Sequence, residues 1–145
     1  MKDLNRVRRS KIAYEQLLIK VEQLETLATH ITANLTGMPK AEGKSPDEIW
    51  AMLADYKNQC IGAVYQYLRD CKELDAEIDS LPYDPNTEFQ IRAVMKCRYL
   101  DGMTGADISE KLHYSERYVR ELISRGRTLY NEKYGYGSED NDVRV

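Results

Sequence analysis

Two long stretches in which apolar residues recur at steps of three and four constrain the fold of this chain most strongly. This spacing is that of the a and d positions of a coiled coil, so the sequence predicts two long helices that pack along a seam. The first stretch supplies Val7, Tyr14, Leu17, Val21, Leu24, Ala28, Ile31 and Leu35. The second stretch supplies Ile49, Leu53, Tyr56, Cys60, Ala63, Tyr67, Cys71, Leu74, Ile78 and Leu81. Two successive steps of four between Ala63 and Cys71 predict local unwinding of the supercoil.

Turn signals between the two stretches predict that the helices fold back on each other. Thr36-Gly37 ends the first helix, because glycine tolerates the left-handed conformation that closes a helix. After a link over 38–44, Ser45 caps the second helix, Pro46 takes its first position and Glu48 completes a capping box. A link this short favours an antiparallel hairpin.

Apolar residues outside the seam predict a second packing partner for the hairpin. Trp50, Ile61, Val64 and Leu68 widen the apolar face of the second helix, which implies contact with another protomer or with the C-terminal part of the chain. The residues expected to form the coiled coil or to contact a partner are Leu17, Val21, Leu24, Ile31, Trp50, Leu53, Tyr56, Tyr67 and Leu74.

Pro82 and Pro85 interrupt the helical pattern and predict a domain boundary. We therefore expect a coiled-coil hairpin over 1–81, a stiff proline hinge over 82–87, a helix-turn-helix domain over 88–134 and an acidic flexible tail over 135–145. The composition agrees with an all-α fold, since the chain is rich in Leu, Glu, Lys and Ala and poor in Gly and Pro.

The stretch over 104–130 predicts two helices joined by a tight turn. The short first helix has Ala106, Ile108 and Leu112 as its apolar residues, and His113-Tyr114 makes the turn. Ser115 is placed to cap the second helix, whose buried stripe consists of Val119, Leu122, Ile123, Gly126 and Leu129. The opposite face carries Glu116, Arg117, Arg120, Glu121 and Arg125. Arginines near the start of such a helix suit insertion into the major groove of DNA.

The run over 88–130 resembles region four of bacterial sigma factors. Its leading helix carries Ile91, Val94, Met95, Arg98 and Tyr99, and 107–112 reads DISEKL where that family commonly reads E-I-A-E-x-L. The whole layout is similar to a family of small phage and prophage sigma region four-like transcriptional regulators. The segments that carry this likeness are 35–39, 78–82, 99–104 and 114–117.

The resemblance implies a DNA-binding regulator of phage genes, with late genes as the expected targets, in the cytoplasm of a bacterial host. Its residues that read bases would be Glu116, Arg117, Arg120 and Glu121. Sigma factors often carry arginine at the first of these positions and glutamine at the last, so the DNA sequence read by this chain should differ from the host promoter element. Our candidates for phosphate contacts are Lys111, Ser115, Arg125, Arg127 and Lys133. The implied partners are double-stranded promoter DNA and RNA polymerase or another phage or host regulator.

Charge and composition argue against several other classes of protein. The net charge of −3 differs from the strong positive charge of a protein that coats DNA without specificity, and the basic residues are local: one cluster opens the chain with Arg6 and Arg8. Three separated cysteines offer no metal-binding spacing. We find no catalytic constellation, cofactor motif, signal peptide or membrane-spanning run.

Two other interpretations of the sequence remain open. A phage small terminase subunit for DNA packaging also joins a helix-turn-helix to long helices, although such proteins usually place the DNA-binding motif first. Alternatively, the chain is a helical interaction protein that does not bind DNA. The sequence also leaves open whether the hairpin pairs with itself, forming a homodimer, or with another protein, and whether the regulator activates or represses.

Overall fold

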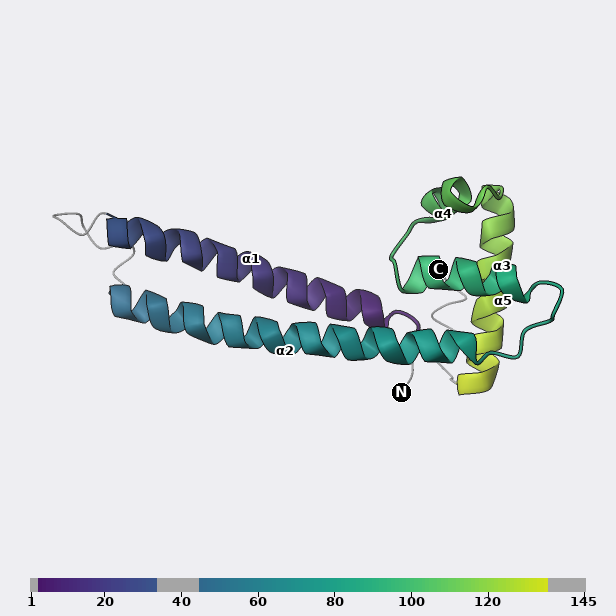
Figure 1. Cartoon of the computed structure of the whole chain (residues 1–145), viewed down its shortest axis with the longest axis horizontal. Coiled ribbons are helices and arrows are strands. Elements are labelled where there is room, and N and C mark those ends of the chain that lie inside the picture. Colours follow the sequence, from purple (N-terminus) through teal and green to yellow (C-terminus); the bar gives the residue numbers. More distant parts are fainter. Residues whose placement is uncertain (1–2, 34–44, 136–145) are drawn as a thin grey trace. The chain divides into compact units, whose positions relative to one another are not determined.

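The structure, a computed structural model, describes residues 3–33 and 45–135, and all regular elements in these ranges are helices (Figure 1). They are α1 (Arg6–Ala33), α2 (Pro46–Asp79), α3 (Glu88–Tyr99), α4 (Gly105–Leu112) and α5 (Glu116–Tyr134). The all-α prediction is therefore confirmed for this part of the chain. The predicted end of the first helix at Thr36-Gly37, the link over 38–44 and the tail beyond Gly135 lie outside the described residues.

The contacts divide the chain into two compact units, which are described separately. One unit contains residues 9–68, and the other contains 1–8 together with 69–145. This division differs from the predicted boundary at 82–87, because the C-terminal end of α2 and the start of α1 make their contacts with the C-terminal helices.

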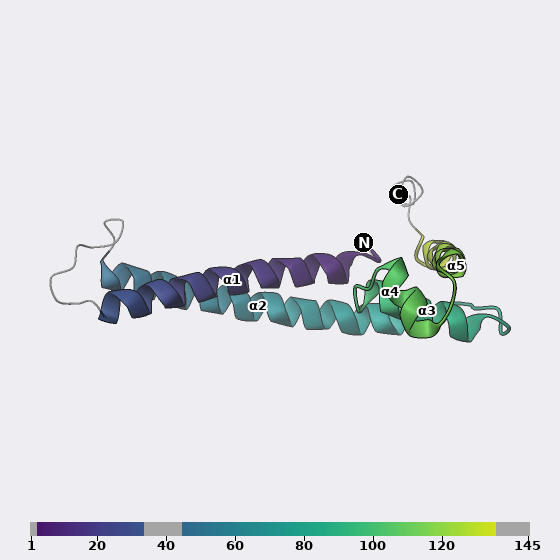
Figure 2. The ribbon, with the colours of Figure 1, turned by 90° about the horizontal axis from the view of Figure 1, so that it is seen from above.

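The 9–68 unit is an antiparallel pair formed by α1 and α2, which run side by side in both views (Figures 1 and 2). The buried side chains of its core are Val21, Leu24, Ala28, Ile49 and Leu53. Nearer the other end of the pair, the rings of Tyr14 and Tyr67 lie 5.1 Å apart between centroids.

The seam predicted from the three-and-four spacing is buried or half-buried throughout the described part of this unit. Leu17, Tyr56 and Tyr67 are half-buried, while the side chain of Ile31 lies outside the described residues. Trp50 is instead 48% exposed, so it belongs to the outer surface of the pair. The capping box that begins α2 is present, since the Ser45 hydroxyl accepts from the backbone N–H of Glu48 at 3.2 Å.

The second unit is centred on α5, against which α3 and α4 both pack. The side chains that fill its core come from these three helices, from the end of α2 and from the start of the described chain. They include Leu4, Val7, Leu74, Ile78, Ile91, Val94, Met95, Ile108, Val119, Leu122 and Tyr130. The predicted stripe on α5 is confirmed, with Val119, Leu122 and Gly126 buried and Ile123 and Leu129 half-buried.

A buried polar network ties the start of α1 to the end of α2 and to α5. The Arg6 guanidinium donates to Glu77 Oε1 at 2.8 Å and to the Tyr130 hydroxyl at 3.3 Å. The Tyr130 hydroxyl in turn donates to Glu77 Oε1 at 2.7 Å. Burial, followed by the hydrogen bond to Glu77, raises the pKa of Tyr130. Because each member bonds to the other two, this network fixes the three segments together.

Cations from α3 and α5 surround the C-terminal end of α2, whose last turn has no basic residue of its own. Lys96 Nζ lies 3.0 Å from an oxygen of Asp75 and 2.8 Å from an oxygen of Asp79. Lys133 Nζ donates to the backbone oxygen of Ser80 at 2.7 Å. Positive charge at this end of a helix is favourable, because the final carbonyl groups carry partial negative charge.

The proline-containing segment after α2 is part of the second unit and contacts the helices on both sides of it. The Tyr83 hydroxyl donates to the backbone oxygen of Ile78 at 2.5 Å, and Arg92 lies over the Tyr83 ring at 5.4 Å from its centroid. Leu81, predicted as the last seam residue, is buried beyond the end of α2 at Asp79. The interactions at both ends of 80–87 explain why the division between units falls earlier in the chain.

We predict that Gly126→Ala destabilises the second unit. A Cβ at this position would lie 2.6 Å from Cγ of the buried Met95, so the core would have to move, at a cost of about 1–3 kcal/mol. Gly62→Ala is the matched control, because a Cβ there meets open space in an exposed helix. It should stabilise the chain by about 0.5–1 kcal/mol. Urea unfolding followed by circular dichroism measures both changes, and equal effects of the two substitutions would contradict the packing described for α3 and α5.

We also predict that the second unit loses stability above about pH 10. Burial raises the pKa of Tyr83 to about 12, whereas a tyrosine in the unfolded chain titrates near pH 10. Unfolding therefore releases a proton between these values, so the stabilisation is complete below pH 10 and is lost as pH rises toward 12.

Tyr83→Phe should reduce this alkaline loss by about 1–2 kcal/mol while lowering stability at neutral pH, since its hydrogen bond to Ile78 is removed. Tyr65→Phe, measured in dilute solution, is the control, because Tyr65 is 60% exposed in a single copy of the chain. Free energies of unfolding measured from pH 8 to pH 12 compare the slopes, and a slope unchanged by Tyr83→Phe would disprove the assignment.

Candidate nucleic-acid interface

The α4–α5 pair is fixed locally by capping interactions at the start of each helix and at the end of α4. Thr104 begins α4 with a capping box: its hydroxyl accepts from Asp107 N–H at 3.1 Å, and the Asp107 carboxylate accepts from Thr104 N–H at 3.3 Å. His113 ends α4 in the left-handed conformation, with φ at 62°. Ser115 then begins α5, and its hydroxyl accepts from Tyr118 N–H at 3.1 Å, as the sequence predicted.

Packing behind the turn directs the first half of α5 outward. Ile108 of α4 is fully buried, and so are Val119 and Leu122 on the inner face of α5. The Ser109 hydroxyl donates to the backbone oxygen of Tyr114 and so ties α4 to the turn. A short helix is thus braced against the inner face of a longer one whose opposite face is open to solvent.

All four residues predicted to read bases lie on this open face. Glu116, Arg117, Arg120 and Glu121 are exposed and occupy the first two turns of α5. Glu116 also has a structural explanation, because a carboxylate in the first turn interacts favourably with the helix dipole.

The arginines of this face differ from the cations that the fold uses. Arg92 and Lys96 form ion pairs with carboxylates of the same unit. Within the described residues, no ion pair is recorded for Arg117, Arg120 or Arg125, and all three are exposed. Their charge is therefore available to an external anion.

One hollow of about 430 Å³ joins part of this face to the start of α4. Its basic lining comes from Arg98, Arg120 and Arg127, and Gly105 and Ala106 bring the N-terminal turn of α4 to its edge. The backbone N–H groups of such a turn carry partial positive charge, which adds to that of the guanidinium groups. Glu116 also lines the hollow and offsets part of this charge.

The predicted phosphate contacts do not form one group. Lys111 and Ser115 flank the turn and are exposed, and Arg127 is half-buried in the hollow just described. Lys133 lies at the other end of α5, about 26 Å from Glu116 along the helix axis, and its ammonium group bonds to Ser80. The Lys133 side chain thus contributes to the end of α2, and its phosphate contact stays a prediction.

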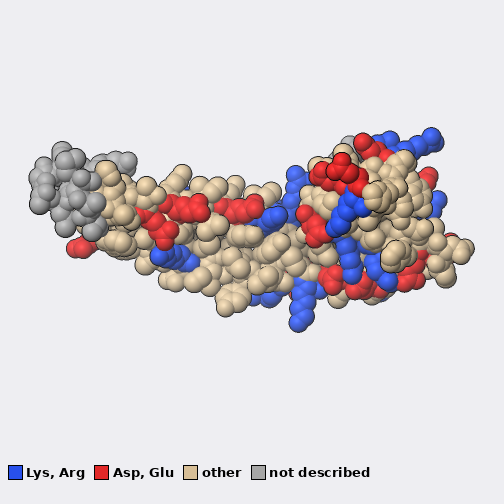
Figure 3. All heavy atoms as spheres, turned by 45° about the horizontal axis from the view of Figure 1, so that its top comes forward, with Lys and Arg blue, Asp and Glu red and all other residues tan. Residues whose placement is uncertain are grey.

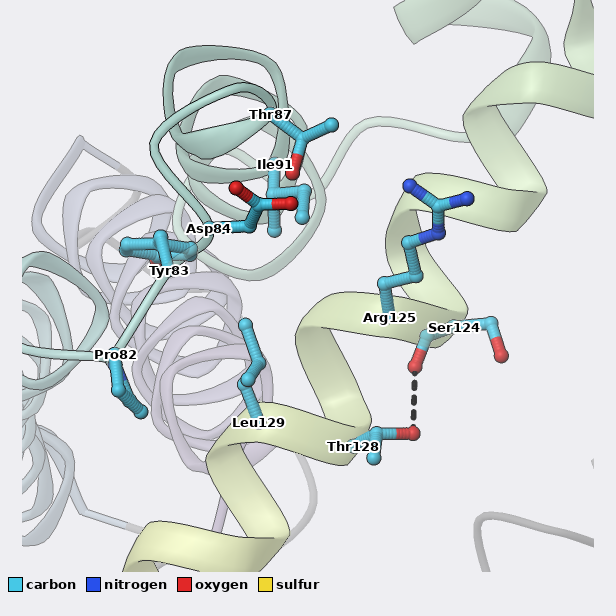
Figure 4. Close-up of a pocket in the computed structure, with 9 residues that line it drawn as sticks. All are labelled: Pro82, Tyr83, Asp84, Thr87, Ile91, Ser124, Arg125, Thr128 and Leu129. Carbon is cyan, nitrogen blue, oxygen red and sulfur yellow. Dashed lines mark hydrogen bonds between the residues drawn. The ribbon is translucent and has the colours of Figure 1, made fainter.

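Arg125 lines a second hollow that the sequence did not indicate (Figure 4). This hollow, of about 590 Å³, lies between 82–91 and the second half of α5. Pro82, Tyr83, Ile91 and Leu129 form its apolar part, and the Arg125 side chain lies at one side. The apolar residues come from three separate segments, so no local pattern could have revealed the hollow.

Charge on the visible face of the C-terminal unit is mixed, with basic and acidic side chains interspersed (Figure 3). Such a surface attracts the phosphate backbone less than a continuous basic patch would. In the described ranges, no three His, Cys, Asp or Glu side chains are grouped in a way that could hold a metal ion. None of the helices described is both long and apolar enough to span a membrane.

Comparison with known proteins gave no match: no protein-family model fits this chain, and no similar protein was found among curated sequences or solved structures. The likeness to sigma region four thus depends on the residues quoted for it and stays a prediction.

We predict that the Ser115 hydroxyl stabilises the chain by capping α5. Ser115→Ala removes the acceptor for Tyr118 N–H and should lower the free energy of unfolding by about 1 kcal/mol. Ser115→Asp keeps an acceptor and should retain wild-type stability, since aspartate is an equally good cap. Thermal unfolding measures both variants, and equal destabilisation by the two would show that the hydroxyl does not act as a cap.

Proposed function

We propose that the chain is a sequence-specific DNA-binding transcriptional regulator that presents the first half of α5 to the major groove of promoter DNA. The observation that carries the proposal is the exposed pair Arg117 and Arg120, without ion-pair partners in the described structure, on a helix braced from behind by α4. Guanidinium groups in this setting can pair bidentately with guanine or bind a phosphate.

The resemblance to phage sigma region four-like regulators supports a role in phage gene expression, with late genes as the expected targets. In this proposal the protein works in the bacterial cytoplasm and assists or replaces a sigma contact with RNA polymerase. The acidic Glu116 and Glu121 favour selectivity over affinity, because they repel phosphate and can accept from the amino group of cytosine. The isolated protein should therefore bind DNA weakly and with strong sequence preference.

A selection of duplex fragments from the phage or prophage genome, read at two salt concentrations, tests the proposal. Wild-type protein should recover a defined upstream region, and higher salt should reduce the recovery. Arg120→Ala should weaken binding to that region by about 1–3 kcal/mol, as expected for the loss of one base-reading arginine.

Arg8→Ala is the matched control for this selection, because Arg8 is exposed on α1 outside the α4–α5 pair. It should leave the recovered sequence unchanged. The selection is repeated with RNA polymerase to detect binding that needs this partner. Failure to enrich any region in either arm, or equal recovery by wild type and Arg120→Ala, would contradict the proposal and favour a helical interaction protein that does not bind DNA.

A further inference from the structure

The 9–68 unit carries most of the large apolar side chains that the described structure leaves exposed. Ile12, Leu18 and Ile19 of α1 and Trp50, Ile61, Tyr65 and Leu68 of α2 are each between 41% and 60% exposed. The remaining one, Phe89, belongs to the other unit. Contiguous exposed apolar surface on a small helical unit marks a site of association.

The α2 residues of this set share one flank of the helix. Counted at 100° per residue, Trp50, Ile61, Tyr65 and Leu68 lie within a narrow sector beside the seam formed by Leu53, Tyr56 and Cys60. Ala54 and Lys57 lie in or beside the same sector, and both are exposed. We call this strip over 50–68 the α2 flank; it is about 28 Å long.

The neighbouring flank of α1 has a different character. It carries Glu15, Glu22 and Glu25 around Leu18, and the Glu25 carboxylate lies 3.2 Å from Nζ of Lys57 on α2, which shows that the two flanks adjoin. In Figure 3 acidic side chains run along the hairpin beside uncharged surface. An apolar partner would thus meet α2, while two α1 flanks brought together would repel each other.

We propose that the α2 flank pairs with the same flank of a second copy of this chain, with the two α2 helices antiparallel. The flank can pair with itself: Ala54 in its first half leaves room for a large side chain, and its second half carries the large Tyr65. In an antiparallel pair centred between Lys57 and Gly62, Tyr65 meets Ala54 of the second copy, and Leu68 lies against Trp50. Tyr65 then fills the space over Ala54 on both sides of the two-fold axis.

The size of the flank sets the expected strength of the dimer. A strip one helix wide and about 28 Å long lies at the small end of specific interfaces, so the dimer should be reversible, with Kd on the order of micromolar. The inference does not depend on DNA binding, because it concerns the hairpin alone.

Sedimentation equilibrium of the full chain, from about 1 to 100 micromolar, tests the dimer. The wild type should pass from monomer to dimer over this range. Leu68→Glu should raise Kd at least about tenfold, because each new carboxylate would enter the apolar contact with Trp50 of the second copy. Phe89→Glu is the control: it also removes an exposed apolar side chain, but from the other unit, and should leave Kd unchanged.

A charge exchange tests the antiparallel register. Ala54→Glu and Tyr65→Lys should each weaken the dimer, and the double variant should restore it, since each new glutamate would face a new lysine of the second copy. The four positions substituted in these tests are exposed in the monomer: Ala54, Tyr65, Leu68 and Phe89. Unchanged helix content by circular dichroism checks that each variant folds. A wild type that stays monomeric throughout would overturn the proposal, and so would a double variant no better than its single parents.

Discussion

The contact on which the second unit depends is the hydrogen-bonded network of Arg6, Glu77 and Tyr130. It joins three segments that are far apart along the chain, and its members are hydrogen-bonded to one another within a largely apolar core. A buried charged pair of this kind adds little net stability compared with apolar residues, but it penalises every arrangement in which one member is left alone. The network therefore specifies which surface of α5 faces the ends of α1 and α2, and so leaves the other surface open.

Local features of this fold were predictable from the sequence, and long-range polar contacts were not. The seam of the hairpin, the caps at Ser45 and Ser115 and the stripe on α5 follow from residues within a few positions of each other, where spacing alone determines the geometry. Arg6 instead reads as one member of a basic cluster, and Tyr130 as an ordinary amphipathic side chain. Nothing local indicates that Arg6 bonds to a residue 71 positions away.

The same limit applies to the candidate site. Lys133 was grouped with the other cations of α5, yet its partner Ser80 is 53 positions away and at the end of another helix. Helical periodicity gives the direction of a side chain around its own axis but not the neighbour that it meets. Residues at the start of α5 face solvent as predicted, because no other part of the described chain packs over that face. The periodicity of a single helix was therefore sufficient.

The conformation of His113 limits which sequences can keep the geometry of the candidate interface. This residue adopts a left-handed backbone, with φ at 62°, between the braced helix and the exposed one. Glycine and asparagine adopt it at little cost, whereas a β-branched residue would be strained by about 1–2 kcal/mol. The angle between α4 and α5 is thus protected by one backbone position rather than by the charged residues beside it. Relatives of this chain could change what α5 recognises while this position kept a small set of residue types.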